Sequence, residues 1–174
     1  GHYALVTLHR PSNVDDASTL RGLLRAIGSV AERLPVVWPA HPRVRSRLDE
    51  RTLPKGLSVI EPAGYLDFLA LQDGAGLVLT DSGGVQEETT VLGVPCLTLR
   101  TTTERPVTIT EGTNRLVGVD PEAVTAAAAA ALDHGAEPRC PKLWDGRAGT
   151  RIAEAIERFV PVPLDLRAES GLLV

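Results

Sequence analysis

Aromatic side chains, cysteines and an excess of positive charge are all scarce in this sequence. Phe, Trp and Tyr together make up 3% of the residues, so the core must be built from aliphatic side chains. Two cysteines, Cys96 and Cys140, are too few for a disulfide framework, and Cys96 in its apolar run is expected to be a small buried hydrophobe. The formal net charge of −4 argues against binding to nucleic acid or to a membrane surface.

Long hydrophobic runs and a leader pattern are also lacking. No stretch approaches the length that spans a membrane, and the first residues do not have the pattern of a signal peptide. These observations predict a cytoplasmic protein without a membrane partner. The chain itself is taken as one domain, because 174 residues with 43% hydrophobic and 23% charged residues suit a single sizeable core.

Short apolar runs alternate with helical patterns along nearly the whole chain. This alternation predicts a parallel, doubly wound, Rossmann-like α/β sheet. An amphipathic helix over residues 151–159 is expected to close the fold. Strands are expected over residues 3–8, 35–38, 57–60, 77–80, 95–99 and 115–118.

Polar residues follow most of these strands. In open α/β sheets ligands bind at the carboxyl ends of the strands, so these side chains should converge on one edge. Histidines, arginines, hydroxyls and a glycine turn together suit a diphosphate with an attached sugar. The segments concerned are His9-Arg10, His41, Glu61-Pro62, Asp81-Ser82-Gly83 and residues 100–105.

The chain is organised around residues 77–88, where an apolar strand runs into a turn with two glycines and then a helix. Unpaired N–H groups at such a helix start form an anion site, and glycine lets a ligand approach the backbone. The helix should end at Gly93, with Pro95 as a stop signal. A serine-hydrolase role for Ser82 is disfavoured, because Thr80 stands where the nucleophile elbow requires glycine.

Glu88 shares a helix face with Val85 and Leu92, where a carboxylate is costly unless it is paired. Two interpretations stay open for Glu88: it faces a ligand, or it is a solvated acid near a helix start. The second interpretation suits its neighbour Glu87 well. Phe68 stands near a strand's carboxyl end, and core packing is its default reading.

Several kinds of cofactor lack their usual patterns in the sequence. No glycine fingerprint follows the first strand, which disfavours a nicotinamide cofactor. A P-loop lysine pattern and a metal-ligand cluster of convincing spacing are also missing, so no cofactor is predicted. The arginines between residues 43 and 51 are typical of a solvated face, with a phosphate site as the alternative.

Taken together, these motifs resemble the UDP-N-acetylglucosamine 2-epimerases of the bacterial, non-hydrolysing type. The pieces span nearly the whole chain in the right order, and their combination is highly specific. The matching pieces are Val6-Thr7-Leu8-His9-Arg10, Glu61-Pro62, Tyr65-Leu66-Asp67-Phe68, residues 80–88, Leu92-Gly93-Val94-Pro95, Thr102-Thr103-Glu104-Arg105-Pro106, residues 112–118 and Leu143-Trp144-Asp145-Gly146.

The resemblance implies a two-lobed, glycosyltransferase-B-like architecture, of which residues 1–174 would be the carboxyl-terminal, nucleotide-binding lobe. The amino-terminal lobe, with most of the acid–base carboxylates, would be absent from this chain, and the full-length enzyme would be a homodimer. The implied activity is interconversion of UDP-N-acetylglucosamine and UDP-N-acetylmannosamine by elimination and re-addition of UDP. In this scheme the isolated chain should bind UDP-sugars without turning them over.

The resemblance also implies roles for individual residues. Ser82 and Gly83 would hold the diphosphate, and Gly84 would shape the turn. Glu88 would bind the ribose, and Phe68 would contact the uracil. Arg105 and His9 would contact the phosphates and the leaving group, with His9 as the catalytic residue. Arg10 would bind the substrate, and Arg10 and His41 would form a possible activator site.

Some positions depart from the family pattern, which puts fine contacts in doubt. Pro11-Ser12 stand where many members have Arg-Glu, Ala63 where some have glutamine, and Val107 where many have glutamate. Hydrolysing members usually carry Asn-Ser-Ser in place of Asp81-Ser82-Gly83, which favours the non-hydrolysing type. Two alternatives remain: half of a sugar-nucleotide glycosyltransferase, and a stand-alone UDP-sugar-binding or regulatory module.

Overall fold

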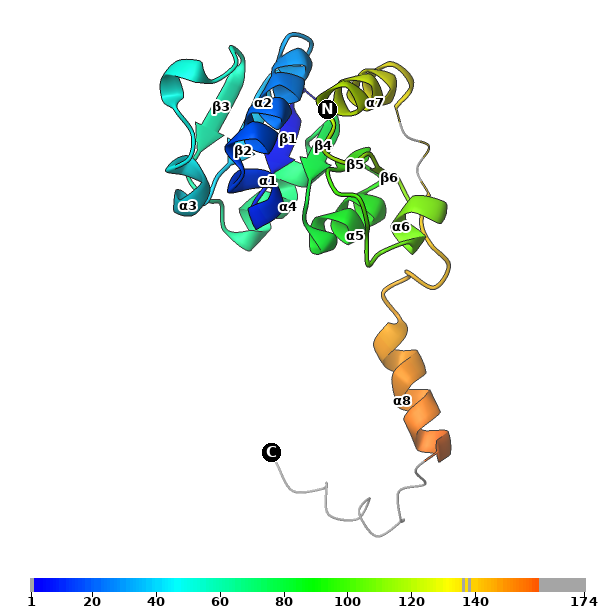
Figure 1. Ribbon diagram of the computed structural model, residues 1–174. Helices are drawn as coiled ribbons and strands as arrows, with labels where there is room; N and C mark the ends of the chain where they lie inside the picture. Colours follow the sequence, from blue (N-terminus) through cyan, green and yellow to red (C-terminus); the bar gives the residue numbers. More distant parts are fainter. Residues whose placement is uncertain (1, 136, 138, 160–174) are drawn as a thin grey trace. The chain divides into compact units, whose positions relative to one another are not determined.

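Six short parallel strands form one sheet in the computed structural model, which describes residues 2–135, 137 and 139–159 (Figure 1). Their order is β3-β2-β1-β4-β5-β6, so the sheet grows in both directions from the β1–β4 pair. The predicted parallel, doubly wound sheet is therefore confirmed. The strands are β1 (Ala4–Thr7), β2 (Val36–Pro39), β3 (Leu57–Ile60), β4 (Leu77–Thr80), β5 (Cys96–Thr98) and β6 (Asn114–Leu116).

Helices connect the strands, and the chain divides into two compact units. The first unit, Gly1–Pro141, contains the whole sheet, and the second, Lys142–Val174, contains one described helix. The helices are α1 (Pro11–Val14), α2 (Ala17–Ala31), α3 (Pro42–Arg45), the 3₁₀ turn η1 (Glu50–Thr52), α4 (Tyr65–Asp73), α5 (Gly83–Leu92), α6 (Val107–Thr110), α7 (Pro121–His134) and α8 (Ala148–Phe159).

The two faces of the sheet carry two separate apolar clusters. Successive side chains of a strand point to opposite faces, so Ala4 and Val6 pack with α2 and α7, whereas Leu5 packs with α4 and α5. Both faces are thus covered, which is what parallel sheets require. The core is aliphatic apart from the fully buried Trp38. Cys96 is buried as predicted, and burial raises the pKa of its thiol to about 12.

Local sequence signals account for several helix ends. The side chain of Asp16 caps α2 by accepting a hydrogen bond from the Thr19 N–H at 2.7 Å. Asp120 caps α7 in the same way, with Pro121 in the first turn. Gly93 ends α5 in the left-handed conformation with φ of 72°, as predicted.

Three expectations need correction. The last strand spans Asn114–Leu116 rather than residues 115–118, because its register with β5 runs from Asn114 opposite Cys96 to Leu116 opposite Thr98. The short helices α1 and α6 were not predicted, since four residues are too few to show a hydrophobic period. The last helix was expected to close the fold, but α8 belongs to the second unit and buries none of its residues.

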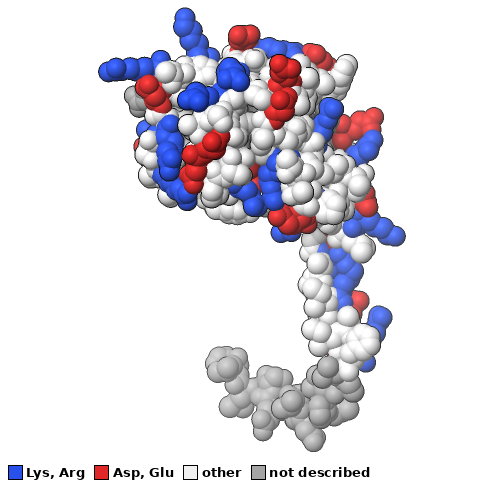
Figure 2. Space-filling model, in the orientation of Figure 1, with Lys and Arg blue, Asp and Glu red and all other residues white. Residues whose placement is uncertain are grey.

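Charged side chains of both signs are interspersed on the face of the molecule shown in Figure 2. On this face, recognition of an anion must therefore be argued from individual groups rather than from a broad basic surface. Among the described residues, no helix is both long and apolar enough to cross a membrane.

Candidate functional site

The candidate site lies at the carboxyl ends of β1, β4 and β5. Thr7 is opposite Thr80 in the register of the first pair, and Thr80 is opposite Thr98 in that of the second. These three strands therefore end at the same level, and the loops that follow them meet at one edge. Within a sheet of this order, the β1–β4 neighbours mark the topological switch point, where open α/β sheets bind ligands.

Asp81, directly after β4, is the centre of this edge. Its side chain is fully buried and accepts hydrogen bonds from the loop that follows β1. The donors are the backbone N–H of Arg10 at 2.9 Å, that of His9 at 3.1 Å, and Nδ2 of Asn13 at 3.1 Å. Nδ2 of Asn13 also donates to the carbonyl of Leu99, at 2.9 Å, beyond the end of β5. One carboxylate thus holds the β1 loop against the β4 turn.

His9 has an ion-pair partner in the same carboxylate. Its Nδ1 lies 2.9 Å from Oδ1 of Asp81, while 54% of the side chain stays exposed. The hydrogen bond to Asp81 raises the pKa of His9 most, and the negative charge of Asp81 raises it further. Partial burial and the Arg10 charge act in the opposite direction, but the net shift is upward.

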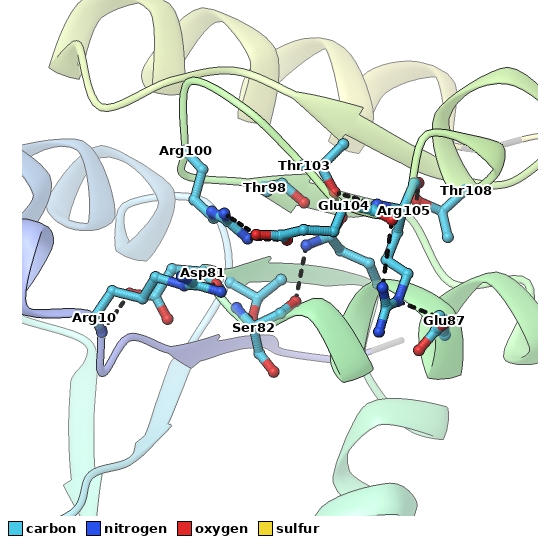
Figure 3. Close-up of polar contacts among 12 residues, drawn as sticks. Arg10, Asp81, Ser82, Glu87, Thr98, Arg100, Thr103, Glu104, Arg105 and Thr108 are labelled. Carbon is cyan, nitrogen blue, oxygen red and sulfur yellow. Dashed lines mark hydrogen bonds and ion pairs between the residues drawn. The ribbon is translucent and has the colours of Figure 1, made fainter.

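Two arginines lie near this carboxylate (Figure 3). Nε of Arg10 donates to the backbone carbonyl of Asp81 at 3.1 Å. Arg100, whose side chain is only 11% exposed, makes two 2.8 Å hydrogen bonds to the carboxylate of Glu104. Arg10 and Arg100 line a hollow of about 280 Å³ together with Ser12, Asn13, Thr101, Thr102 and Val119.

The helix start after β4 differs from the sequence-based description in one respect. Ser82 is the N-cap of α5, and the two glycines form the first helical turn rather than a turn before it. Neither glycine has positive φ, so their use is not conformational. A Cβ built on Gly83 or Gly84 would meet nothing within 4 Å, so open space lies beside both residues.

Gln86 links this helix start to the loop after β5. It is fully buried, and its Nε2 donates to the Ser82 carbonyl at 2.9 Å. Its Oε1 accepts hydrogen bonds from Oγ1 of Thr103 at 2.6 Å and from Nδ2 of Asn114 at 3.2 Å. The loop that carries Arg105 is therefore fixed to α5 by a buried amide.

Arg105 itself lies beside an acid of α5. Its Nε is 2.8 Å from Oε1 of Glu87, as a close ion pair in which the N–H is not aligned for a hydrogen bond. Figure 3 shows the Arg105 side chain extending toward Glu87. Both side chains are about 40% exposed, with 42% for Arg105 and 40% for Glu87, so an incoming anion can reach the guanidinium.

Glu88 and Phe68 lie on the face of the sheet that α4 and α5 cover. Oε2 of Glu88 accepts a 2.6 Å hydrogen bond from Nε2 of Gln72, which is fully buried. Phe68 packs in part against the apolar cluster around Leu5 and is otherwise exposed. Phe68 thus has the core contact expected by default, with part of its ring left accessible.

His41 has a structural role in this fold. It is the N-cap of α3, where its Nδ1 accepts a hydrogen bond from the Arg43 N–H at 3.3 Å. No described contact joins it to Arg10, so the predicted activator pair is not brought together by direct bonds. Among the described residues, no group of three or more His, Cys, Asp or Glu side chains could hold a metal ion.

The structure brings His9, Arg10 and Ser82 to one edge and places Arg105 on a loop tied to the same helix. Sequence reasoning placed Asp81 at this edge but gave it no role of its own, and it missed Gln86 as a contributor. The signal for Asp81 was available, because a carboxylate directly after a fully buried strand must find partners. Gln86 gave no signal, since its partners Thr103 and Asn114 are distant in the sequence.

These features define a Rossmann-like α/β domain whose polar side chains gather at the switch point of the sheet. Comparison with known proteins makes the class specific. A family model described as UDP-N-acetylglucosamine 2-epimerase matches residues 1–157. The chain belongs to the UDP-N-acetylglucosamine 2-epimerase family.

Individual relatives agree with this assignment. The UDP-N-acetylglucosamine 2-epimerase of Methanocaldococcus jannaschii is 41% identical over 88% of this chain and 44% of its own length. The UDP-2,3-diacetamido-2,3-dideoxy-D-glucuronate 2-epimerase of Pseudomonas aeruginosa is 38% identical over 90% and 45% of the two chains. A crystal structure of the M. jannaschii enzyme in complex with UDP-GlcNAc and UDP superposes with a TM-score of 0.78, at 40% identity and over 90% and 45% of the two chains. The chain therefore spans less than half the length of these relatives.

Proposed function

We propose that this chain is the carboxyl-terminal, nucleotide-binding lobe of an enzyme that interconverts UDP-N-acetylglucosamine and UDP-N-acetylmannosamine. The observation that carries the proposal is the edge at which Asp81 gathers His9 and Arg10 beside the open start of α5. The M. jannaschii relative, with its UDP-GlcNAc and UDP complex, supports the same ligand class.

The diphosphate would bind at the start of α5. The N–H groups of Gly83 and Gly84 and the hydroxyl of Ser82 offer donors there, and the helix dipole favours negative charge. Arg105 would exchange its Glu87 partner for a phosphate oxygen, since both side chains are accessible. His9 would donate to the phosphates from the β1 side of the same edge.

The nucleoside would lie toward α4 and α5. Glu88 would accept hydrogen bonds from the two ribose hydroxyls while Gln72 holds its Oε2. The accessible part of Phe68 would contact the uracil. Arg10 would contact the substrate. Arg10 and His41 would also contribute to an activator site between the lobes, although no described contact joins these two residues.

In the proposed reaction a base removes the proton from C2 while the bond from C1 to the UDP oxygen breaks. This gives an unsaturated sugar, free UDP and a protonated base. Reprotonation of C2 on the opposite face and return of UDP to C1 then give the epimer. UDP leaves as an anion, so donors aimed at its phosphates lower the barrier. The C2 base is assigned to the other lobe.

The partners follow from this assignment. The chain would work with an amino-terminal lobe, in a cytoplasmic enzyme whose full-length form is a homodimer.

A second substrate is favoured by one observation. The P. aeruginosa relative, at 38% identity, is named for UDP-2,3-diacetamido-2,3-dideoxy-D-glucuronate. The sugar-binding half of such a site is assigned to the other lobe, so the UDP-binding groups of this chain would serve either sugar nucleotide. The glycosyltransferase half and the binding module are the remaining alternatives.

Calorimetry of this chain with UDP, UDP-N-acetylglucosamine, UDP-2,3-diacetamido-2,3-dideoxy-D-glucuronate and NAD tests the ligand class. We expect binding of the three uridine nucleotides and no binding of NAD. Binding of NAD in preference to UDP, or of neither, would contradict the proposed site. Epimerisation is then measured with the full-length protein, because a transferase half or a binding module would bind UDP-sugars without producing UDP-N-acetylmannosamine.

A further inference from the structure

The carboxylate of Asp81 is fully enclosed, and its charge is satisfied almost entirely by one short segment. Backbone and side-chain donors of His9, Arg10 and Asn13 all converge on it. The guanidinium of Arg10 bonds to the backbone carbonyl of Asp81 and not to its carboxylate. Burying a carboxylate is costly unless it is fully hydrogen-bonded. This arrangement therefore keeps a buried negative charge whose ion-pair partner is the ring of His9.

This contact fixes which ring nitrogen of His9 is available. Nδ1, 2.9 Å from Oδ1 of Asp81, must carry a proton to donate to a carboxylate. Nε2 lies on the other side of the ring, and the side chain is 54% exposed. A histidine held in this way presents Nε2 outward, in an orientation set by the buried acid.

We propose that Asp81 is a positioning residue for the proposed reaction: it holds His9 as an imidazolium whose Nε2–H donates to the phosphate of departing UDP. The inference rests on the proposed function, because it names the group that orients the phosphate donor. Asp81 follows β4 and His9 follows β1, so the pair spans the switch point at which the ligand is placed. The donor needs no further movement when negative charge develops on the leaving oxygen.

The charges around the ring agree with this role. Asp81 faces His9 from the β4 side, and its effect on the pKa of His9 outweighs that of Arg10 on the same loop. Arg100 interacts electrostatically with Asp81 from the β5 side, and Glu104 with Arg10. Arg100 and Glu104 are bonded to each other and largely offset one another.

The first test needs no variant. The four histidines of the chain are labelled with ¹⁵N, and the ring resonances of His9 are followed across pH. We expect the neutral ring to carry its proton on Nδ1 and to titrate above the ordinary histidine value of 6.5. A neutral ring with the proton on Nε2 would overturn the proposal, whatever the chain binds.

The second test compares Asp81→Asn with Asn13→Ala. Both remove a hydrogen bond within the same turn, but only Asp81→Asn removes the charge beside His9. We expect the His9 titration midpoint to fall in Asp81→Asn and to stay at the wild-type value in Asn13→Ala. An unchanged midpoint in Asp81→Asn, or equal shifts in both variants, would overturn the proposal. If Asp81→Asn does not fold, the tautomer of the His9 ring measured in the wild-type chain decides whether the proposal stands.

The third test links the pair to the phosphate. UDP and uridine are titrated into the wild-type chain and Asp81→Asn at neutral pH. We expect Asp81→Asn to lower the affinity for UDP about fivefold and the affinity for uridine hardly at all. The reason is that a neutral donor binds an anion less strongly than a charged donor does. Equal losses for both ligands would overturn the proposal. If the wild-type chain binds neither ligand, the proposed function fails instead, while the His9 tautomer is still measured independently.

Discussion

Nε2 of Gln72 donates a 2.6 Å hydrogen bond to Oε2 of Glu88, which joins α4 to α5. Gln72 is fully buried, and its Oε1 has no hydrogen-bond partner in the part of the chain that the structure describes. This bond explains how a carboxylate is tolerated on the helix face that it shares with Val85. It also orients Glu88, because one of its oxygens is held by a residue that cannot move into solvent.

Replacement of Glu88 by Gln tests whether this oriented carboxylate reads the ribose. The amide loses the charge and presents an NH₂ group toward a hydroxyl that was donating. We expect UDP binding to weaken by about 1.5–3 kcal/mol, with 2′,3′-dideoxy-UDP, which binds weakly, losing much less. The two ligands together separate the ribose contact from general damage to α5. Equal losses would show that Glu88 does not contact the ribose hydroxyls.

Arg105→Ala tests the phosphate contact proposed for the loop after β5. A charge-assisted bond is worth about 1.5–3 kcal/mol, so UDP affinity should fall roughly ten- to a hundredfold by calorimetry. Glu87→Gln is the matched control, since it breaks the ion pair but leaves the guanidinium in place. Its UDP affinity should not fall. If Arg105→Ala binds UDP with wild-type affinity, Arg105 does not contact the phosphates and is an ordinary loop arginine.

Gln86→Leu tests the buried amide that ties the Arg105 loop to α5. The leucine leaves the Ser82 carbonyl without its amide donor and the Thr103 hydroxyl without its amide acceptor. Each buried polar group left unpaired costs about 1–3 kcal/mol, so the free energy of unfolding in urea should fall by at least about 2 kcal/mol. Val91→Ala, at a 61% exposed position of the same helix, should change it by less than about 0.5 kcal/mol. Similar losses in both variants would contradict this role for Gln86.

The Arg100–Glu104 pair predicts a specific pH dependence. Hydrogen bonds from Arg100 lower the pKa of Glu104 from 4.5 to about 2. Because the folded pKa is depressed, the stabilisation from this carboxylate is fully present above about pH 4.5 and is lost as the pH falls toward 2. The stability difference between the wild type and Glu104→Gln should therefore shrink in that window. A difference that stays constant from pH 5 to pH 2, in urea titrations, would refute the pairing.

The isolated chain should bind UDP-sugars without epimerising them. It spans less than half of the relatives' length, and the C2 base is assigned to the other lobe. Long incubation with UDP-N-acetylglucosamine, followed by chromatography, should show no UDP-N-acetylmannosamine. Accumulation of that product with the pure chain would show that the C2 base belongs to this lobe.

Four of the strands could be predicted well because they are short apolar runs that directly follow a proline or a glycine, namely β2, β3, β4 and β5. β4 and the end of α5 at Gly93 were predicted to the residue. The short helix α6 was not predicted, because it is held in place by its tertiary surroundings, among them the hydrogen bond from Asn114 to Thr108. A four-residue helix of this kind leaves no period in the sequence.

The candidate site could be predicted only where a residue's neighbours in the sequence reveal it. Ser82 and the glycines were found because a strand precedes them and a helix follows. The partners of Glu88 and of Arg105 could not be predicted, since both depend on how α4 and the loop after β5 approach α5. Their assigned roles in binding UDP stay predictions that the variants above test.

The order of the strands has a consequence for how the molecule assembles. β1, β2 and β3 are neighbours both in sequence and in space, and so are β4, β5 and β6. Each triplet can therefore form through shorter loop closures, whereas pairing β1 with β4 closes a longer loop that contains both β2 and β3. We expect this seam to close last on folding. The site that straddles it would then exist only once both halves are complete, and amide exchange of Leu79 would report its closure.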